Sequence, residues 1–396
     1  MTMPALRLRY VARLLRASLI ATLAVAAAGC PPETTFNLGK AEPVSDGVQL
    51  YRLSDPSLLS PPGAVAVQIL RLDPSKVDLQ SATAQDRVVA LETVPEMAAR
   101  HHALCAINAG FFVVKNGDPA GVLEVGGELV SDSTLTRGAI GILRRRGQPV
   151  RLLFDRVSAS VALRYRSGDE EFTVPIDGVD TTRERSKAML YTPRFGPDSD
   201  TASTGVEWQL GGSPLRVLDR RPNAGKTPIP RDGAVLSFGG TVLPTSLEHL
   251  DRDQVVALDT RFQTTRGSLP EQWAEAADVV GGAGLLVHKG RALADWSEEK
   301  LRQGFNTERH PRTIIGTSKN GTIWLITVDG RNPQVSLGMT FTELQHLAAG
   351  LNLVNALNLD GGGSTTMVVN GKIVNHPSDA AGPRKVSDGL IVVPRR

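Results

Sequence analysis

The chain has 396 residues and a formal net charge of +3, and it is rich in glycine (39) and proline (25). Four of its arginines lie within the first sixteen residues. The rest of the chain therefore carries a balance of about −1 and offers no basic surface of the kind that binds nucleic acid. The two cysteines, Cys30 and Cys105, cannot make a disulfide framework, and the scarcity of histidine and cysteine argues against a dedicated zinc site.

The N-terminus has the pattern of an export signal. Arginines at 7 to 16 precede an apolar run over 17–28, which is shorter than the roughly 20 residues that a membrane-spanning helix needs. Small residues precede Cys30, as in a bacterial lipoprotein signal. We therefore expect residues 1–29 to be the signal peptide, Cys30 to carry the lipid, and residues 30–46 to be a flexible tether. Position 31 is not aspartate, which favours an outer-membrane address facing the periplasm; a secreted form is the alternative.

Short apolar runs that are punctuated by turn residues follow. They predict strands over 64–72, 77–81 and 104–108, with a short helix over 94–102. Cys105 falls in the third strand, where a buried and inert thiol is expected. Asn-Gly pairs at 320–321 and 370–371 predict two hairpins, over 313–328 and 367–375. Arg144, Arg145 and Arg146 precede Gly147 and are expected in a solvated hairpin turn.

One helix is well marked. Thr340 and Glu343 have the form of a capping box, and leucines then recur at helical spacing, which predicts a helix over 341–350. A strand over 354–359 should follow. The segment 144–273 shows weak strands but no repeat and no linker. We predict an α+β fold: one strand-rich catalytic domain over 47–396 with a mixed sheet, hairpins and a few short helices.

The loop after this last strand is the first candidate site. Asp360 is followed by Gly361, Gly362 and Gly363 and then by Ser364 and Thr365. Glycines let a ligand approach the backbone closely, and their N–H groups together with the hydroxyls can receive an anion such as a phosphate. An ordinary Asp-Gly turn is the alternative interpretation.

Two further segments place polar side chains at strand ends. Arg312 and Thr313 begin a strand, and a guanidinium matches the two free oxygens of a phosphodiester. His310 precedes them, as an acid/base or, preferably, as a residue constrained by the proline that follows it. Asn108 ends a buried strand, where it would bind a sugar hydroxyl or N-acetyl group or merely cap a turn.

Glu124 and Asp329 are further carboxylates at strand ends. Either one could be the second acid of a catalytic pair or could merely close a turn. The chain contains no HExxH, CxxC pair, P-loop, GxSxG or Ser-x-x-Lys motif set. We expect no required cofactor and no dedicated metal site, while the carboxylates of Asp360 and Asp329 leave a calcium or magnesium ion open.

Several of these segments together resemble the phosphodiester glycosidase family. The segments that carry the resemblance are 108–112 (Asn-Ala-Gly-Phe-Phe), 191–194 (Tyr-Thr-Pro-Arg), 280–282 (Val-Gly-Gly), 309–313 (Arg-His-Pro-Arg-Thr), 327–331 (Thr-Val-Asp-Gly-Arg), 338–340 (Gly-Met-Thr) and 357–364 (Leu-Asn-Leu-Asp-Gly-Gly-Gly-Ser). They run in order over about 64–394. Ala109 stands where many members have glycine, and 157–182 matches least well, which leaves the substrate preference open.

The resemblance implies an exported hydrolase that removes a sugar, expected to be an N-acetylhexosamine, from a sugar-1-phosphodiester or phosphosugar polymer of the envelope or exopolysaccharide. Because the leaving phosphate is a weak base, one carboxylate can suffice, and we expect Asp360 to be nucleophile or general base. A second acid about 5 Å away would favour retention, and one about 6.5–9.5 Å away inversion. The alternatives are a non-catalytic envelope lipoprotein that binds phosphosugar polymers and a phosphodiesterase that cleaves P–O.

Overall fold

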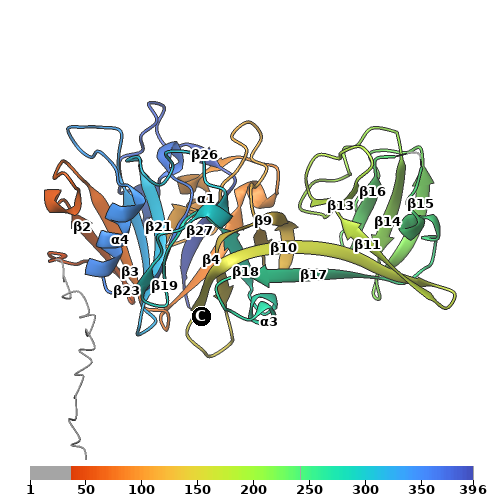
Figure 1. Cartoon of the computed structure of the whole chain (residues 1–396), viewed down its shortest axis with the longest axis horizontal. Helices are drawn as coiled ribbons and strands as arrows, with labels where there is room; N and C mark the ends of the chain where they lie inside the picture. The colour runs from red at the N-terminus through yellow and green to blue at the C-terminus, as the bar shows by residue number, and fades with distance from the viewer. Residues whose placement is uncertain (1–36, 241, 396) are drawn as a thin grey trace, which may run out of the picture. The chain divides into compact units, whose positions relative to one another are not determined.

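The computed structural model describes residues 37–240 and 242–395, which belong to one compact unit. The expected signal peptide (1–29) and Cys30 lie outside the described residues. The described chain is mostly β, with several sheets and few short helices (Figure 1), so the strand-rich architecture is confirmed and the helical share is small. Strand β1 (Glu42–Ser45) pairs with β2 and lies within the segment that the sequence assigns to a tether.

The main sheet has eight strands, each antiparallel to its neighbours. Because neighbouring strands are antiparallel, β21 (Arg312–Ser318) begins at the edge of the sheet where β22 (Ile323–Val328) and β23 (Leu353–Asn358) end. In spatial order the strands are β1, β2 (Val48–Leu53), β3 (Val67–Leu72), β22 (Ile323–Val328), β21 (Arg312–Ser318), β23 (Leu353–Asn358), β19 (Leu285–His288) and β20 (Arg291–Ala292).

A second, five-stranded sheet packs on one face of the main sheet. Its strands, all antiparallel, are β25 (Lys372–Ile373), β24 (Met367–Val369), β6 (Cys105–Asn108), β27 (Asp388–Pro394) and β4 (Val77–Thr83). Period-two alternation along the main-sheet strands makes this packing possible. Leu70, Ile315 and Leu357 point into the core that the two sheets share, and their neighbours point to the opposite face.

Helix α4 (Phe341–Gly350) covers that opposite face, over β19 and β23 (Figure 1). Its predicted bounds are confirmed. The capping box also forms, because Thr340 Oγ1 accepts from Glu343 N at 3.2 Å and Glu343 Oε2 accepts from Thr340 N at 2.9 Å. Phe341, Leu344 and Leu347 bury the apolar side of the helix against the sheet.

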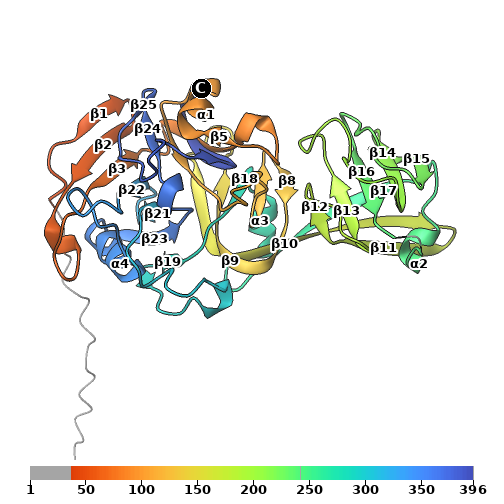
Figure 2. The same ribbon diagram turned by 90° about the horizontal axis from the view of Figure 1, so that it is seen from above.

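A third and a fourth sheet contain most of the remaining strands (Figure 2). The third contains β11 (Glu170–Ile176), β10 (Arg151–Ser167), β9 (Ser133–Leu143), β18 (Asp278–Gly281), β7 (Leu123–Val125) and β8 (Glu128–Ser131), with β17 (Val256–Thr264) paired to β10. The fourth contains β12 (Gly178–Val179), β13 (Ala188–Tyr191), β16 (Ala234–Phe238), β14 (Val206–Gly211) and β15 (Arg216–Pro222). In sequence the fourth sheet is inserted between β11 and β17.

The remaining elements are short: β5 (Glu92–Thr93) paired with β26 (Lys385–Val386), helices α1 (Val94–Arg100), α2 (Thr245–Glu248) and α3 (Pro270–Ala274), and 3-10 turns η1 (Pro56–Leu58), η2 (Ala84–Asp86), η3 (Ser297–Glu299) and η4 (Gly362–Ser364). The predicted mixed sheet is found only in the fourth sheet. Among the pairs of described strands only β12 and β13 run parallel, and the other pairs are antiparallel.

Several local expectations are confirmed. Both residues of the second Asn-Gly turn adopt positive φ, Asn370 at 48° and Gly371 at 74°, as a tight hairpin turn requires. Cys105 is fully buried and unpaired, and burial raises the pKa of its thiol to about 12. The 144–146 turn forms between β9 and β10, but Arg144 is not merely solvated, since its Nη2 lies 3.0 Å from the buried Asp278 carboxylate.

Candidate active site

The candidate site lies where the two packed sheets end together. Asp360 follows β23 of the main sheet, and Asn108 ends β6 of the second sheet. Asp360 N donates to Ala109 O at 2.8 Å, and Asn108 Nδ2 donates to Asp360 O at 2.7 Å. These two bonds hold the backbone of Asp360 between the sheets, although 252 residues separate it from Asn108.

A cavity of about 110 Å³ opens beside Asp360. Its wall is formed by residues from three segments: Arg302, Phe305, His310, Pro311, Arg312, Arg331, Asp360, Gly361 and Gly362. Asp360 is half-buried beside this cavity, and its Oδ1 accepts from Gly361 N at 2.9 Å. Burial raises the pKa of Asp360 to about 6, with a smaller upward contribution from Asp388, while Ser364, Gly361 and Arg384 act in the opposite direction.

The three glycines mainly leave space for neighbouring side chains. Gly361 N is used by Asp360, and Gly362 N donates to Pro311 O at 2.9 Å, so neither N–H group is directed at a ligand. A Cβ on Gly362 would lie 2.9 Å from Arg331 Nη2, and one on Gly363 would overlap Arg384 and Asp379. Absent side chains thus let guanidinium groups pack on the loop beside Asp360.

Arg312 lies in the cavity wall but is not the exposed phosphate ligand that the sequence suggests. It is 1% exposed and is packed between the rings of Phe305 and Phe341. Its guanidinium donates to three carbonyl oxygens, those of Met339 (2.9 Å), Phe305 (2.6 Å) and Glu308 (3.0 Å). Burial lowers its pKa to about 10. Arg312 therefore fixes the wall of the cavity.

The exposed cations of the cavity are Arg302 and Arg331. Both side chains line it, and within the described chain neither forms an ion pair. Arg331 Nη1 makes only a long contact, 3.4 Å, with Ser378 Oγ. The sequence reasoning passed over both residues as ligands. Arg331 belongs to the Asp-Gly-Arg segment noted above, whereas nothing local marks Arg302.

Asn108 and the hydroxyl residues are interior. Asn108 Oδ1 accepts from Thr313 Oγ1 at 2.8 Å and from Thr366 N at 3.1 Å, so both of its acceptor positions are used within the protein. Thr313, Ser364 and Thr365 are buried as well. The structure therefore gives these residues a positioning geometry around Asp360 rather than direct contact with a ligand.

His310 lines the cavity near Asp360. Burial lowers the pKa of its imidazole, and the neighbouring cations Arg312 and Arg331 lower it further, while Glu308 raises it. His310 Nε2 lies 3.4 Å from the Glu308 carboxylate. A neutral imidazole beside Asp360 is the state that these surroundings favour.

Neither of the two expected partner acids lines the Asp360 cavity. Glu124 lies on β7 beside Asp278; burial, followed by that neighbouring charge, raises the pKa of Glu124 to about 7, but it does not line the Asp360 cavity. Asp329 is buried and accepts hydrogen bonds from the side chains of Gln68, Asn375 and His376.

Asp388 is a carboxylate that the sequence did not single out, and its charge acts on Asp360. Asp388 begins β27, where its Oδ1 accepts from Gly110 N at 2.6 Å and its Oδ2 from Ser387 Oγ at 2.5 Å. Burial raises the pKa of Asp388, and its charge contributes to the raised pKa of Asp360. The Asp388-Gly389 pair at a strand start was the only signal in the sequence.

The described residues contain no group of three or more histidine, cysteine or acidic side chains that could hold a metal ion. The expectation that no metal is required stays a prediction. No helix in the described ranges is both long and apolar enough to cross a membrane.

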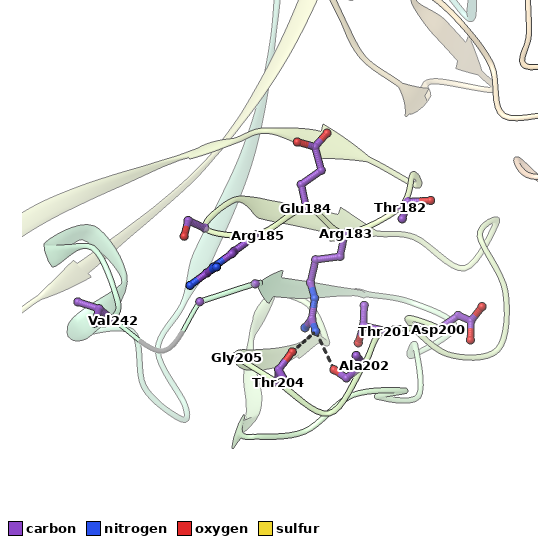
Figure 3. A pocket seen from close by; sticks show the side chains of 13 residues that line it. Thr182, Arg183, Glu184, Arg185, Asp200, Thr201, Ala202, Thr204, Gly205 and Val242 are labelled. Carbon is purple, nitrogen blue, oxygen red and sulfur yellow. Dashed lines mark hydrogen bonds between the residues drawn. The ribbon is translucent and has the colours of Figure 1, made fainter.

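A larger cavity, about 630 Å³, lies in the inserted fourth sheet (Figure 3). Arg183 reaches into it but is engaged by the protein, donating to Ala202 O at 2.7 Å and to Thr204 Oγ1 at 3.2 Å. The wall also contains Glu184, Arg185 and Asp200, and the two carboxylates form ion pairs with Lys187 (2.7 Å) and Lys226 (3.8 Å). None of the segments that carry the family resemblance lines this cavity, so we place the chemistry in the smaller one.

Comparisons with known proteins point to one family. Residues 215–393, which include Asp360, match the family model described as phosphodiester glycosidase. The bovine (Bos taurus) N-acetylglucosamine-1-phosphodiester alpha-N-acetylglucosaminidase is 39% identical over 87 residues, which cover 20% of this chain and 16% of the bovine protein. The chain thus matches less than a fifth of that relative's length.

Two solved structures share the fold. A hypothetical protein from Synechocystis has a TM-score of 0.74 at 24% identity, over 90% of this chain and 64% of that one. A Burkholderia pseudomallei protein, described as exported, has a TM-score of 0.70 at 25% identity, over 84% of this chain and 74% of that one. The expected resemblance is therefore confirmed: residues 215–393 of this chain match the phosphodiester glycosidase family model.

Proposed function

We propose that this protein hydrolyses the bond between the anomeric carbon of a sugar and the phosphate oxygen of a sugar-1-phosphodiester. The observation that carries the proposal is the placement of Asp360, half-buried and with a raised pKa, in one cavity with the unpaired guanidiniums of Arg302 and Arg331. A carboxylate near the anomeric carbon and cations near the phosphate are what this cleavage needs.

In the proposed reaction Asp360 acts as nucleophile or as general base on water. The C–O bond breaks and its electron pair leaves with the phosphate. Water, attacking directly or hydrolysing a glycosyl ester formed on Asp360, supplies the hydroxyl of the free sugar, and its proton goes to the phosphomonoester. That leaving group is a weak base, so no strong general acid is required. Arg302 and Arg331 offset the charge that builds on it, while Arg312 and Asn108 hold the wall and the loop.

The substrate we propose is an N-acetylhexosamine-1-phosphodiester. The bovine relative's name supports this sugar. Attachment to an envelope or exopolysaccharide component, the lipid on Cys30 and an outer-membrane address facing the periplasm are part of the proposal. They rest on the pattern of residues 1–30 and on the exported Burkholderia neighbour, with a secreted form as the alternative.

Asp360→Asn tests the proposal. With UDP-N-acetylglucosamine as the probe substrate, this variant should lose turnover by at least about a thousandfold, since the reacting group is gone. Thermal unfolding is the control. The variant should be no less stable than the parent at pH 7, because burial penalises the carboxylate that it removes. Full activity in a folded Asp360→Asn protein would contradict the assignment.

Hydrolysis in ¹⁸O-labelled water separates the alternatives. Label in the free sugar supports the glycosidase. Label in the phosphate identifies a phosphodiesterase, and binding without any product identifies a non-catalytic phosphosugar-binding protein.

A further inference from the structure

A second cavity adjoins the first across Arg331. It has a volume of about 260 Å³, and its wall includes the polar side chains of Asp329, Arg331, Asn332, His376 and Ser378. Arg331 lines both cavities, with Nη1 at 3.4 Å from Ser378 Oγ on one side and Nη2 beside Gly362 on the other. One unpaired cation thus stands between Asp360 and the second cavity.

His376 is the side chain of interest in this cavity. It is 72% exposed, yet one of its ring nitrogens is held, since His376 Nδ1 lies 3.0 Å from Asp329 Oδ2. Asp329 is buried and receives further hydrogen bonds from Gln68 Nε2 (3.1 Å), Asn375 Nδ2 (3.1 Å) and His376 N (2.9 Å). Both oxygens of Asp329 already accept from amide N–H groups, so we assign Nδ1 as the donor in its contact with Oδ2.

This arrangement fixes the direction of the ring. With Nδ1–H bound to a buried carboxylate, Nε2 points away from Asp329, and Arg331 and Ser378 line the same cavity as His376. An anion that contacts Nε2 would accept a hydrogen bond from it when that nitrogen carries a proton. No such role follows from sequence, because His376 lies 47 residues from Asp329.

We infer that the second cavity binds the phosphomonoester half of the substrate, with Arg331 and the Nε2–H of His376 as the groups that hold its phosphate. The alcohol side of the phosphate then lies against Asn332 and Ser378, whose amide and hydroxyl suit a hydroxylated group such as glycerol or a sugar. This inference rests on the proposed function, which places the sugar at Asp360, and adds to it the class of group beyond the phosphate.

Binding of a product-like ester to the full-length protein tests the inference without any turnover. Glycerol 1-phosphate and inorganic phosphate are titrated into the parent protein and into His376→Gln, with affinity measured by calorimetry. The variant should bind glycerol 1-phosphate at least about tenfold more weakly, because it loses one charge-assisted hydrogen bond. His249→Gln is the matched control, since it removes an exposed imidazole that lines neither cavity.

A direct readout distinguishes contact from a structural effect. In ¹H–¹⁵N spectra of the histidine rings, the Nε2 resonance of His376, assigned by its absence from the variant, should shift on addition of glycerol 1-phosphate. Thermal unfolding shows whether His376→Gln is folded. Equal affinity in folded His376→Gln and parent, or no binding of either probe to the parent, overturns the inference.

The two proposals fail separately. Binding that depends on His376 in a protein that releases no sugar supports this cavity and contradicts the glycosidase. Turnover that depends on Asp360, together with phosphate-ester binding that His376→Gln does not change, supports the glycosidase and contradicts the inference about the second cavity.

Discussion

At the scale of single residues, the site separates side chains that face the cavity from side chains that hold the wall. Asp360, Arg302 and Arg331 are open to it, whereas Arg312 and Asn108 are engaged by backbone and side-chain groups of the protein. The difference is one of exposure and hydrogen bonding, since a buried guanidinium that satisfies three carbonyls is not free to bind phosphate.

The raised pKa of Asp360 predicts the pH dependence of turnover. Asp360 acts only when ionised, so kcat/KM should be constant above pH 7 and should fall as the pH drops below about 6, approaching tenfold per unit. Initial rates from pH 4 to 8 measure this fall in kcat/KM, the acid limb of the pH profile. Asp388→Asn should move it to lower pH, because Asp388 contributes to the rise. An acid limb near pH 4 in the parent would mean that an unperturbed carboxylate does the chemistry.

At the scale of elements, three strand ends and one helix start define the site. β22 and β23 end, and β21 begins, at the same edge of the main sheet, which brings Asp329, Asp360 and Arg312 to one side. Helix α4 supports that edge through its first turn. Glu343 caps the helix and also binds Arg309 Nη2 at 2.5 Å, two residues before Pro311.

The capping box of α4 gives a prediction about stability. Thr340→Ala should lower the free energy of unfolding by about 1 kcal/mol, since it removes the acceptor of Glu343 N. Chemical denaturation measures the change. Thr342→Ala, exposed in the same turn, is the control and should be neutral or stabilising by a few tenths of a kcal/mol. Similar losses in both variants would show that the cap contributes nothing specific.

At the scale of the whole molecule, the site draws on segments far apart in the chain. The family match begins at residue 215, yet Asn108 and Gly110, which hold Asp360 and Asp388, lie before it. Elsewhere the third sheet and the main sheet are joined through Glu299. This buried side chain accepts from Gly138 N on β9 at 3.0 Å and from Leu285 N on β19 at 3.1 Å.

Glu299 predicts a large effect on global stability. Glu299→Gln should cost about 3–5 kcal/mol, because it leaves the buried Arg156 guanidinium, bound at 3.0 Å, without that charge and turns an amide donor toward backbone N–H groups. Glu298→Gln removes the other carboxylate that pairs with Arg156. Because the Glu298 side chain is 49% exposed, the free energy of unfolding should fall by less than about 1 kcal/mol. Equal losses in urea unfolding would contradict this reading.

The sequence by itself determined what depends on neighbours along the chain. The capped helix over 341–350, the Asn-Gly hairpin, the buried Cys105 and the glycine loop after a strand all follow from local periodicity and turn chemistry. The antiparallel pairing of nearly all strands and the scarcity of helix did not follow, since short apolar runs do not specify their partners.

The tertiary structure alone decided which polar groups share a cavity. Arg302 rather than Arg312 is exposed, Asp388 rather than Glu124 lies near Asp360, and Asp329 orients His376. Each of these outcomes depends on the pairing of strands from distant parts of the chain and on the burial that the pairing produces. Residue type and spacing can name a carboxylate or a guanidinium, but only packing determines whether it faces a ligand or the core.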